Sequence, residues 1–433
     1  MITINKYVWA KESDEVRKKI LHRAGTDISQ LVSVVQPICE AVKTRGDDAL
    51  VEFTAKFDNA VIKKNQIAVT PAEFEEARTS LDDKAKEVIR YASGNIWRFH
   101  ETQKVEPIWM MEVDKGVIAG EKTTPITDVA LYIPRGRGSF PSVLLMLGNP
   151  AVVAGVPRII VITPPNEQGK IDPAILFAAD LLGIKEIYKV GGAQAIAAVA
   201  YGTETVPKCS KVIGPGNAYV TAAKRYLMGA IDPGVPAGPS ESIILTDEFA
   251  DPHKAALDMM IEAEHGSDSV ALLVTHSEQV ANAVEQHLQH LVETIKSDQR
   301  RKFVTDVYKT YGGIVITANL NESINFVNDY APEHMEVMVR DPFGALQKIN
   351  NAGEILLGDC TPITMCNFLM GPNAILPTGQ NAKTSSSVSI HDFQKRSSIG
   401  YVTAEGFERV RDFAASFADI EGFETHAKAV RER

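Results

Sequence analysis

The feature that most constrains the fold is a regular alternation of strand-like and helix-like segments that starts at Asp128. The first series has four apolar, β-rich runs, each followed by a predicted helix: DVALYIP, RIIVITPP, EIYKV and KVIGPG. A second series supplies five more: SIILTD, SVALLVTH, GIVITAN, MEVMVRD and EILLGD. Strands that alternate with helices pair in parallel through right-handed crossovers. The pattern therefore predicts an α/β fold with two incomplete Rossmann-like parallel-sheet domains.

The two ends of the chain are predicted to be helical. Residues 11 to 103 repeat apolar positions every three or four residues, and the segment Thr70-Pro71-Ala72-Glu73 has the form of a capping box. We expect these N-terminal helices to complete the second sheet domain. After Pro377 the sequence turns polar before a last helical stretch, from about Ala404 to Arg433. A tail of about 50 residues is too short for its own core, so it should dock on this subunit or on another.

Charge and cysteine content exclude several classes of partner. The 433 residues include 55 acidic and 45 basic side chains, a formal net charge of −10, which would repel nucleic acid and anionic lipid. No run approaches the roughly 18 apolar residues of a membrane span. The 4 cysteines are scattered and fit neither a zinc ribbon nor a disulfide framework. We therefore expect no nucleic acid and no membrane, and a cytoplasmic location.

Two glycine turns join a predicted strand to a predicted helix, the place where α/β proteins bind phosphates. They are Val190-Gly191-Gly192-Ala193-Gln194 and Ile213-Gly214-Pro215-Gly216-Asn217. Neither has the G-x-G-x-x-G spacing, and tight turns use glycine for geometric reasons alone. The residues therefore leave both a dinucleotide site and a simple turn open.

The histidines give three candidate sites. Glu262 and His265 share one face of a predicted helix, a spacing that suits a metal but equally a solvated face. Glu333-His334 lies in a helix-to-strand loop, where histidine can remove an alcohol proton and glutamate can activate water. An exposed loop pair is the alternative. His426, near the chain end, would ordinarily be a surface residue.

Taken together, the sequence resembles the histidinol dehydrogenase family from about residue 28 to the C-terminus. The strings that carry the resemblance are YIPRGRGSFPSVLLMLGNPAVVAGV, KVGGAQAIAAVAYGTETVPK, IGPGNAYVTAAKR, AGPSES, EAEHGSDS, DYAPEHMEV, GPNAILPTG and EGFETHA. The resemblance implies an NAD-dependent, zinc-binding enzyme that oxidises an amino alcohol through the aldehyde to the carboxylate. It also implies a homodimer in which the C-terminal tail of one subunit completes the other subunit's site.

The resemblance further implies a role for each matching position. Glu333 and His334 match the catalytic pair, with His334 as the base for the alcohol and Glu333 activating water. The expected NAD contacts are Tyr132, Gln194 and Asn217; the expected substrate contacts are Ser240, Glu262, His265, His334, Asn367, Glu421 and His426. The expected metal ligands, for zinc or another divalent cation, are Glu262, His265, Asn367 and His426.

These roles give the predicted domains their functions. We expect an N-terminal helical extension at 1–27 and a discontinuous α/β domain at 28–131 and 241–380 that holds the metal and substrate. A Rossmann-like NAD-binding domain should occupy 132–240. The tail at 381–433 should dock on the partner subunit.

Two departures from the family pattern fall at metal ligands. Glu262 stands where the family has glutamine, and Asn367 stands where it has aspartate. The formal charge of the four ligands is −1 in both cases, because the acid and the amide have exchanged places. We expect the metal to be kept, since carboxylate and amide oxygens both bind divalent cations. The alternative is that the site has decayed.

Two further departures concern the substrate. Ala374 replaces a histidine that contacts substrate in the family, and Arg135 replaces a glycine after Tyr-Ile-Pro. Losing an imidazole enlarges the pocket, whereas Arg135 either binds an anion or is an exposed side chain. The leading hypothesis is therefore an NAD- and metal-dependent oxidation of an amino alcohol or related primary alcohol other than histidinol. The alternatives are a biosynthetic histidinol dehydrogenase and a non-catalytic NAD- or ligand-binding homologue.

Overall fold

The computed structural model describes residues 2–21, 28–135, 138–236 and 238–433 and contains two parallel sheets. In spatial order, the six-stranded sheet consists of β1 (Lys6–Val8), β10 (Gly313–Ile316), β9 (Val270–Thr275), β8 (Glu241–Thr246), β11 (His334–Met338) and β12 (Glu354–Leu357). The four-stranded sheet consists of β6 (Glu186–Tyr188), β5 (Arg158–Ile162), β4 (Asp128–Tyr132) and β7 (Lys211–Ile213). All neighbouring strands in both sheets are parallel, which confirms the predicted α/β class.

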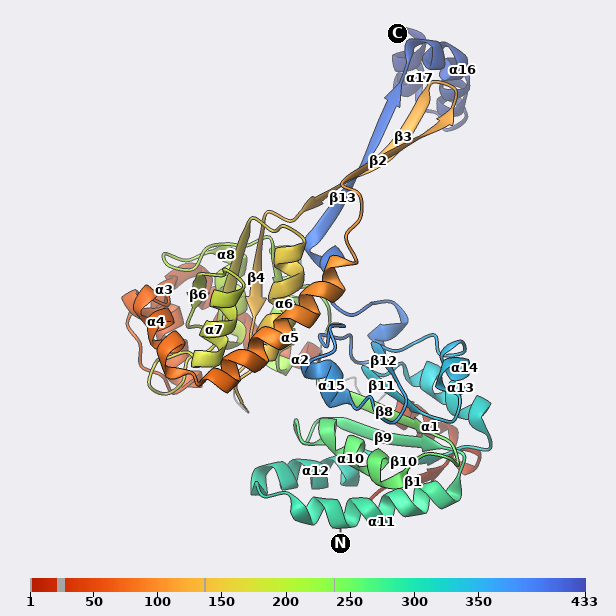
Figure 1. The fold of residues 1–433 in the computed structure, drawn as a ribbon. Helices are drawn as coiled ribbons and strands as arrows, with labels where there is room; N and C mark the ends of the chain where they lie inside the picture. Colours follow the sequence, from red (N-terminus) through yellow and green to blue (C-terminus); the bar gives the residue numbers. More distant parts are fainter. Residues whose placement is uncertain (1, 22–27, 136–137, 237) are drawn as a thin grey trace.

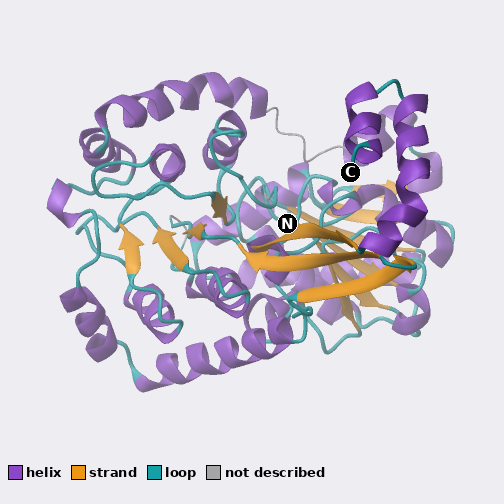
Figure 2. Ribbon diagram, turned by 90° about the horizontal axis from the view of Figure 1, so that it is seen from above, coloured by secondary structure: helices purple, strands orange, loops and turns teal. Residues whose placement is uncertain are grey.

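Most residues of the parallel strands are apolar and buried, because helices cover both faces of each sheet. Figure 2 shows this cover for the four-stranded sheet. Every residue of β8 and β9 is buried. The helices that follow β8 to β12 are α10 (Pro252–Ala263), α11 (Glu278–Thr294), α12 (Asp298–Thr310), α13 (Leu320–Tyr330), α14 (Pro342–Leu346) and α15 (Ile363–Phe368). Those of the four-stranded sheet are α6 (Pro141–Val153), α7 (Pro173–Leu181), α8 (Gly192–Tyr201) and α9 (Ala218–Tyr226). None of the described helices is both long and apolar enough to cross a membrane.

The N-terminal helices pack on the four-stranded sheet, and the expectation that they complete the six-stranded sheet is wrong. They are α2 (Ile28–Arg45), α3 (Asp47–Phe57), α4 (Pro71–Ser80) and α5 (Asp83–Glu101). In α2 and α3 the apolar side chains of Val35, Cys39 and Leu50 share one core with Ala130 and Ile160. On the other face, α4 packs on α7, and α5 packs on α6. A sheet whose strands are buried on both faces needs this cover, and its own crossover helices do not provide all of it.

The first residues differ from the predicted helical extension. Strand β1 lies at the edge of the six-stranded sheet, paired with β10, and helix α1 (Asp14–Leu21) follows it. A three-residue strand carries too few residues to show the alternation that predicts a strand. Residues 22–27, which include the predicted end of the extension, lie outside the described residues.

A third, antiparallel sheet forms an arm that projects from the body of the molecule (Figure 1). It consists of β2 (Ile108–Asp114), β3 (Val117–Pro125) and β13 (Gln394–Val402). Helices α16 (Ala404–Ile420) and α17 (Glu424–Arg431) lie at its far end, where the sequence predicted a helical tail. Within this chain the tail therefore docks on the arm, through the pairing of β13 with β3.

Candidate active site

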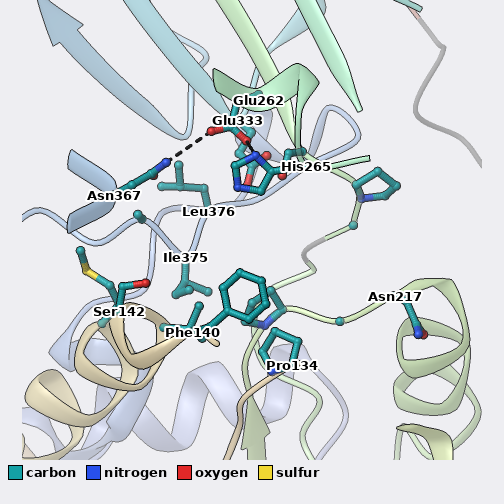
Figure 3. Close-up of a pocket in the computed structure, with 18 of the residues that line it drawn as sticks. Pro134, Phe140, Ser142, Asn217, Glu262, His265, Glu333, Asn367, Ile375 and Leu376 are labelled. Carbon is teal, nitrogen blue, oxygen red and sulfur yellow. Dashed lines mark hydrogen bonds and ion pairs between the residues drawn. The ribbon is translucent and has the colours of Figure 1, made fainter. Parts of the chain in front are cut away.

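A pocket of about 770 Å³ brings together residues from both parallel sheets. Glu262, His265 and Glu333 lie on one side of it, and Asn217 lies across from them at the start of α9 (Figure 3). Predicted site residues that line the pocket are Tyr132, Asn217, Ser240, Glu262, His265, Glu333, His334 and Asn367. Arg135 and Ala374, the two residues expected to depart from the family pattern, line it as well. The structure thus gathers most of the predicted site in one cavity.

The expected catalytic pair lies at the amino end of β11. Helix α13 ends at Tyr330, and the next residue, Ala331, has a φ of +54° that turns the chain through Pro332 into the strand. The backbone N–H of Glu241, in the neighbouring strand β8, donates a hydrogen bond of 2.9 Å to Glu333 Oε2. The usual rule that ligands bind beyond the carboxyl ends of strands therefore applies to the glycine turns but not to this pair.

Burial and neighbouring charges perturb both members of the pair. The Glu333 carboxyl is buried, and this burial, together with the charge of Glu262, raises its pKa well above the usual range. Burial disfavours the charged form of His334, but the charges of Glu262, Glu354 and Glu333 outweigh it and raise the pKa of the ring to about 10. Perturbed acid and base groups in one cleft are typical of proton-transfer sites.

Three of the four expected metal ligands meet at one end of the pocket. Glu262 is in the last turn of α10 and is 1% exposed. Asn367, in α15, donates from Nδ2 to Glu262 Oε1 at 3.3 Å, and His265 Nδ1 lies 3.3 Å from Glu262 Oε2. Burial opposes ionisation of Glu262, but His265, His334 and hydrogen bonds from Asn367 and Ser240 lower its pKa. This carboxylate is therefore held in its charged form.

The chemistry of these three donors suits a divalent cation. A buried carboxylate, an imidazole and an amide oxygen can each bind zinc, and catalytic zinc sites use three protein ligands plus an open position. His265 Nδ1 lies 3.1 Å from the carbonyl oxygen of Ile261, the kind of contact that fixes the orientation of a ligating ring. Within the described ranges, no cluster of three or more histidine, cysteine or acidic side chains is placed to hold a metal. Glu262, His265 and Asn367 of one chain can therefore supply part of the ligand set of a metal site.

The other two expected site residues of the tail do not reach this pocket. Glu421 and His426 are exposed and belong to the α16–α17 region at the far end of the arm (Figure 1). The His426 ring packs against Phe423, with 5.0 Å between the ring centres. Within one chain, His426 cannot be a ligand with Glu262.

The expected cofactor side is built by the two glycine turns at the carboxyl ends of β4, β6 and β7. Tyr132 ends β4, and its hydroxyl accepts a hydrogen bond of 3.2 Å from the backbone N–H of Gly192. A side chain at Gly214 would place Cβ 2.1 Å from the carbonyl oxygen of Tyr132, and its φ of +136° also requires glycine. Gly214 therefore allows the second glycine turn to pass close to β4.

Gln194 shows a feature that a bound ligand would explain. It is 1% exposed, yet neither its Oε1 nor its Nε2 has a hydrogen-bond partner among the described residues. An unpaired buried polar group costs about 1–3 kcal/mol. Asn217, in contrast, is exposed and caps α9 by accepting hydrogen bonds from Tyr219 and Val220 N–H, both 3.1 Å. A bound dinucleotide could pair with the buried Gln194 amide, and its phosphates could accept hydrogen bonds from the N-termini of α8 and α9.

Two buried carboxylates at the site were missed by sequence reasoning. Glu241 begins β8 and accepts hydrogen bonds from the N–H of Gly379, and Glu354 begins β12 and contacts His334. The only signal in the sequence was an acidic residue at the start of an apolar strand. Arg135 is exposed and donates to the carbonyl oxygen of Pro165 at 3.3 Å.

Comparison with known proteins agrees with this geometry. The profile of the family described as histidinol dehydrogenase matches residues 21–433. A histidinol dehydrogenase homolog of Colwellia psychrerythraea is 49% identical over 96% of this chain and 94% of that protein. A histidinol dehydrogenase of Synechocystis is 47% identical over 96% of this chain and 95% of that protein.

The solved structures include a crystal structure of histidinol dehydrogenase from Elizabethkingia anophelis. It superposes with a TM-score of 0.94 at 33% identity and covers 100% of this chain and 98% of that one. The chain therefore belongs to the histidinol dehydrogenase family, a family of oxidoreductases that uses NAD and zinc.

Proposed function

We propose that this protein oxidises a primary alcohol through the aldehyde to the carboxylate, with NAD as hydride acceptor and zinc or another divalent cation at the site. The observation that carries the proposal is the buried Glu333–His334 pair. His334 Nε2 lies 3.9 Å from Glu262 Oε1 and 3.8 Å from Glu333 Oε1, inside a pocket that also reaches Tyr132 and Asn217. The four-stranded sheet would carry the cofactor, and the six-stranded sheet would carry the catalytic and metal-binding groups.

In the first half of the reaction, His334 Nε2 would take the proton of the alcohol hydroxyl while a hydride leaves the same carbon for NAD. In the second half, the positive charge on the adjacent His334 ring would lower the pKa of Glu333, and the Glu333 carboxylate would take a proton from water as the water oxygen adds to the aldehyde carbon. NAD bound at this site would accept the second hydride from the resulting adduct, and the remaining hydroxyl proton would pass to solvent, which leaves the carboxylate. Keeping both halves in one pocket protects the reactive aldehyde, provided that NADH exchanges for NAD between them.

Glu262, His265 and Asn367 would hold the cation. When bound there, it would polarise the substrate oxygen and offset the carboxylate charges that raise the pKa of His334. Burial of the catalytic pair excludes bulk solvent, which strengthens each of these electrostatic interactions.

The pocket favours a substrate other than L-histidinol. Ala374 lies in the wall of the pocket beside Ile375 and Leu376, so this part of the wall is apolar where the family is expected to present an imidazole. A substrate that relied on hydrogen bonds from that imidazole would bind less well here. L-Histidinol is the second candidate, favoured by the 47% identity to the Synechocystis histidinol dehydrogenase.

The arm supports a homodimer in which each tail completes the partner's site. Phe413, Phe417 and Ile420 on α16 are 64–82% exposed, and Trp109 and Met111 on β2 are about half exposed. An apolar surface of this kind marks a protein interface. A second copy of the chain would cover it and carry Glu421 and His426 to the pocket that lacks them.

The direct test measures NADH formation with L-histidinol and with a panel of primary amino and hydroxy alcohols. His334→Gln should abolish the activity, whereas His290→Gln, on the exposed face of α11, should leave it unchanged. Two NADH per L-histidinol at a rate typical of enzymes would establish the second candidate. Silence across the panel with NAD still bound would refute both and favour a non-catalytic homologue.

A further inference from the structure

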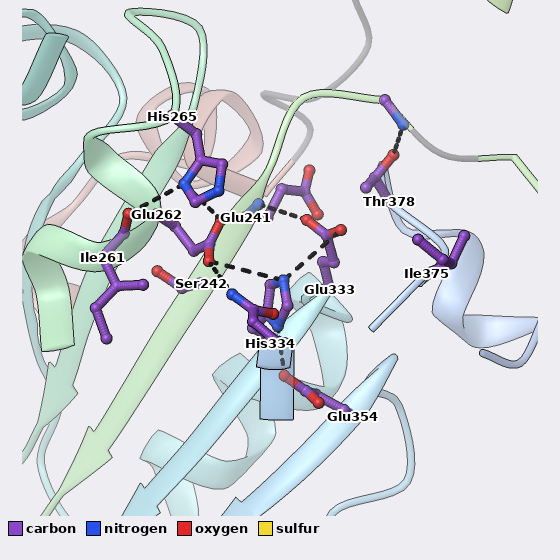
Figure 4. A network of polar contacts seen from close by, with 12 residues as sticks. Glu241, Ser242, Ile261, Glu262, His265, Glu333, His334, Glu354, Ile375 and Thr378 are labelled. Carbon is purple, nitrogen blue, oxygen red and sulfur yellow. Dashed lines mark hydrogen bonds and ion pairs between the residues drawn. The ribbon is translucent and has the colours of Figure 1, made fainter. Parts of the chain in front are cut away.

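Glu354 faces the catalytic histidine from the adjacent strand. Strands β11 and β12 are parallel neighbours, and their register places His334 directly opposite Glu354. Both side chains are buried, with 4% and 6% of their surface exposed. His334 Nδ1 and Glu354 Oε1 are joined by a hydrogen bond, and Figure 4 shows the ring lying between Glu354 and the Glu262–Glu333 side of the pocket.

This contact determines which ring nitrogen faces the substrate. A carboxylate accepts hydrogen bonds only, so the nitrogen beside it, Nδ1, is the one that carries a proton. In the neutral ring the lone pair is then on Nε2, the nitrogen that points toward Glu262 and Glu333. The opposite tautomer would present an N–H to the substrate and could not accept its proton.

Other buried carboxylates nearby are engaged elsewhere. Glu241 accepts hydrogen bonds from the N–H of Gly379. Glu336, two residues along β11, lies against Asp258, and its burial together with the charge of Asp258 raises the pKa of Glu336 to about 10. Glu354 Oε2 is buried and has no hydrogen-bond partner in the described part of the chain. The carboxylate also contacts the Cys366 thiol, but a thiol is a weak donor, so the bond to His334 Nδ1 is its strongest polar interaction.

We propose that Glu354 is a positioning residue, which holds the His334 ring with Nε2 toward the substrate and Nδ1 protonated; this inference rests on the proposed function. When Nε2 takes the alcohol proton, the N–H at Nδ1 stays in place and the carboxylate remains ionised. The Glu354 charge then stabilises the positively charged ring. The aspartate of the serine protease triad orients its histidine and stabilises the charged ring in the same way, and replacing that aspartate by asparagine lowers kcat about 10⁴-fold.

The first measurement compares Glu354→Gln with a matched control, Glu336→Gln. The control replaces a buried carboxyl on the same strand that lies against Asp258 and whose raised pKa favours the neutral form. Glu354→Gln should lower kcat by about 10²–10⁴-fold, the range of general acid–base catalysis. Its KM for the alcohol and its affinity for NAD should stay close to those of the wild type, whereas a merely structural role would change stability and all three parameters together.

The second measurement does not depend on turnover. Ring-nitrogen NMR spectra of the zinc-loaded, full-length protein labelled with ¹⁵N-histidine would identify His334 by its loss in His334→Gln. We expect Nδ1 to carry a proton that the carboxylate shifts downfield, and Glu354→Gln to remove that shift.

An unprotonated Nδ1 in the wild type, or an unchanged kcat in Glu354→Gln, would overturn the inference. If no alcohol is oxidised, the proposed function fails, but the NMR spectrum still decides whether Glu354 orients the ring. If Glu354→Gln does not fold, the wild-type spectrum alone gives the answer.

Discussion

Asn367 Nδ2 lies 3.3 Å from Glu262 Oε1, so an amide and a carboxylate face each other at the two positions where the resemblance to the family leads us to expect the opposite pair. Direct contact is the condition under which two substitutions compensate each other, because the charge lost at one is replaced at the other within the same local field. This contact favours an exchange of roles over independent decay of a metal site. It also makes the pair suitable for a double-mutant cycle.

The cycle uses Glu262→Gln, Asn367→Asp and the double variant. Glu262→Gln removes the buried charge and should lower the zinc content sharply. Asn367→Asp places a second carboxylate against the first and should raise the pKa of one of them. The double variant restores a charge of −1 and should bind zinc as the wild type does. Elemental analysis of protein purified without chelator measures the zinc content of the wild type and of the three variants.

If the two substitutions are unrelated and the metal site has decayed, the four proteins should show a different pattern of zinc content. If the site has decayed, the wild type contains no zinc, and no variant changes the metal content except the double variant, which could regain it. Glu264→Gln is a suitable control, because Glu264 is exposed beside α10 and outside the cavity lining. It should have the zinc content of the wild type.

The position of His426 at the far end of the arm predicts complementation between two inactive proteins. His426→Ala lacks the group that the tail would give to the partner, and His334→Gln lacks the base. Mixed after dissociation, the two should form heterodimers in which one of the two sites has both His334 and His426. NADH formation should return to at most about a quarter of the wild-type rate, because half of the dimers are mixed and each has one active site.

Failure of this mixture to recover activity would contradict a shared site. In that case His426 would act within its own chain, or not at all. Sedimentation of each variant checks that the dimer forms, and Phe417→Asp, in the exposed apolar face of α16, should shift the protein toward the monomer.

The fold was predictable where local pattern determines structure. All nine strands expected from Asp128 onward are present, because a strand buried on both faces reads as an apolar run in any context. The arm was not predicted: β2 is exposed along its whole length, and β13 contains Lys395, Arg396, Ser397 and Ser398, so neither shows a buried face. The side of the molecule on which α2 to α5 pack was predicted wrongly, since helical periodicity reveals an apolar face but not its partner.

The site was predictable where a role is tied to a motif. Glu333-His334, Glu262 and His265 were singled out from the residues, and the family resemblance added Asn367 and Tyr132; all of them line one cavity. Glu354 was missed because its importance comes from strand register, which places it against His334, 20 residues away in the sequence. No local pattern contains that information.

Gln194 provides a prediction in which stability and cofactor binding change in opposite directions. Its buried amide has no partner in the residues that the structure describes, so Gln194→Met should raise the free energy of unfolding of the cofactor-free protein by about 1 kcal/mol. If NAD satisfies the amide, the same variant should bind NAD about tenfold more weakly, equivalent to one hydrogen bond of about 1.4 kcal/mol. Thermal unfolding and NAD titration measure the two effects.

Gln289→Met is the matched control for that experiment. Gln289 is on α11 and its amide is satisfied by both backbone groups of Ile2, at 2.7 and 2.8 Å. Its replacement should destabilise the protein and leave NAD binding unchanged. A Gln194→Met protein that is less stable, with unchanged NAD affinity, would mean that the glutamine has no role with the cofactor.

Lys224 predicts how stability depends on pH. It is a buried residue of α9, and its Nζ donates a 2.7 Å hydrogen bond to the carbonyl oxygen of Gly214 in the second glycine turn. Burial lowers the pKa of Lys224 to about 8 in the folded protein, against about 10.4 in an unfolded chain. Between these values only the unfolded state holds the proton, so the free energy of unfolding rises with pH in this range.

The increase in the free energy of unfolding from pH 7.5 to pH 9.5 should be about 2 kcal/mol larger in the wild type than in Lys224→Met. Denaturant unfolding at both pH values measures it, with the exposed Lys84→Met as a control that should follow the wild type. Equal pH dependence in the wild type and Lys224→Met would show that the lysine keeps its ordinary pKa in the folded protein.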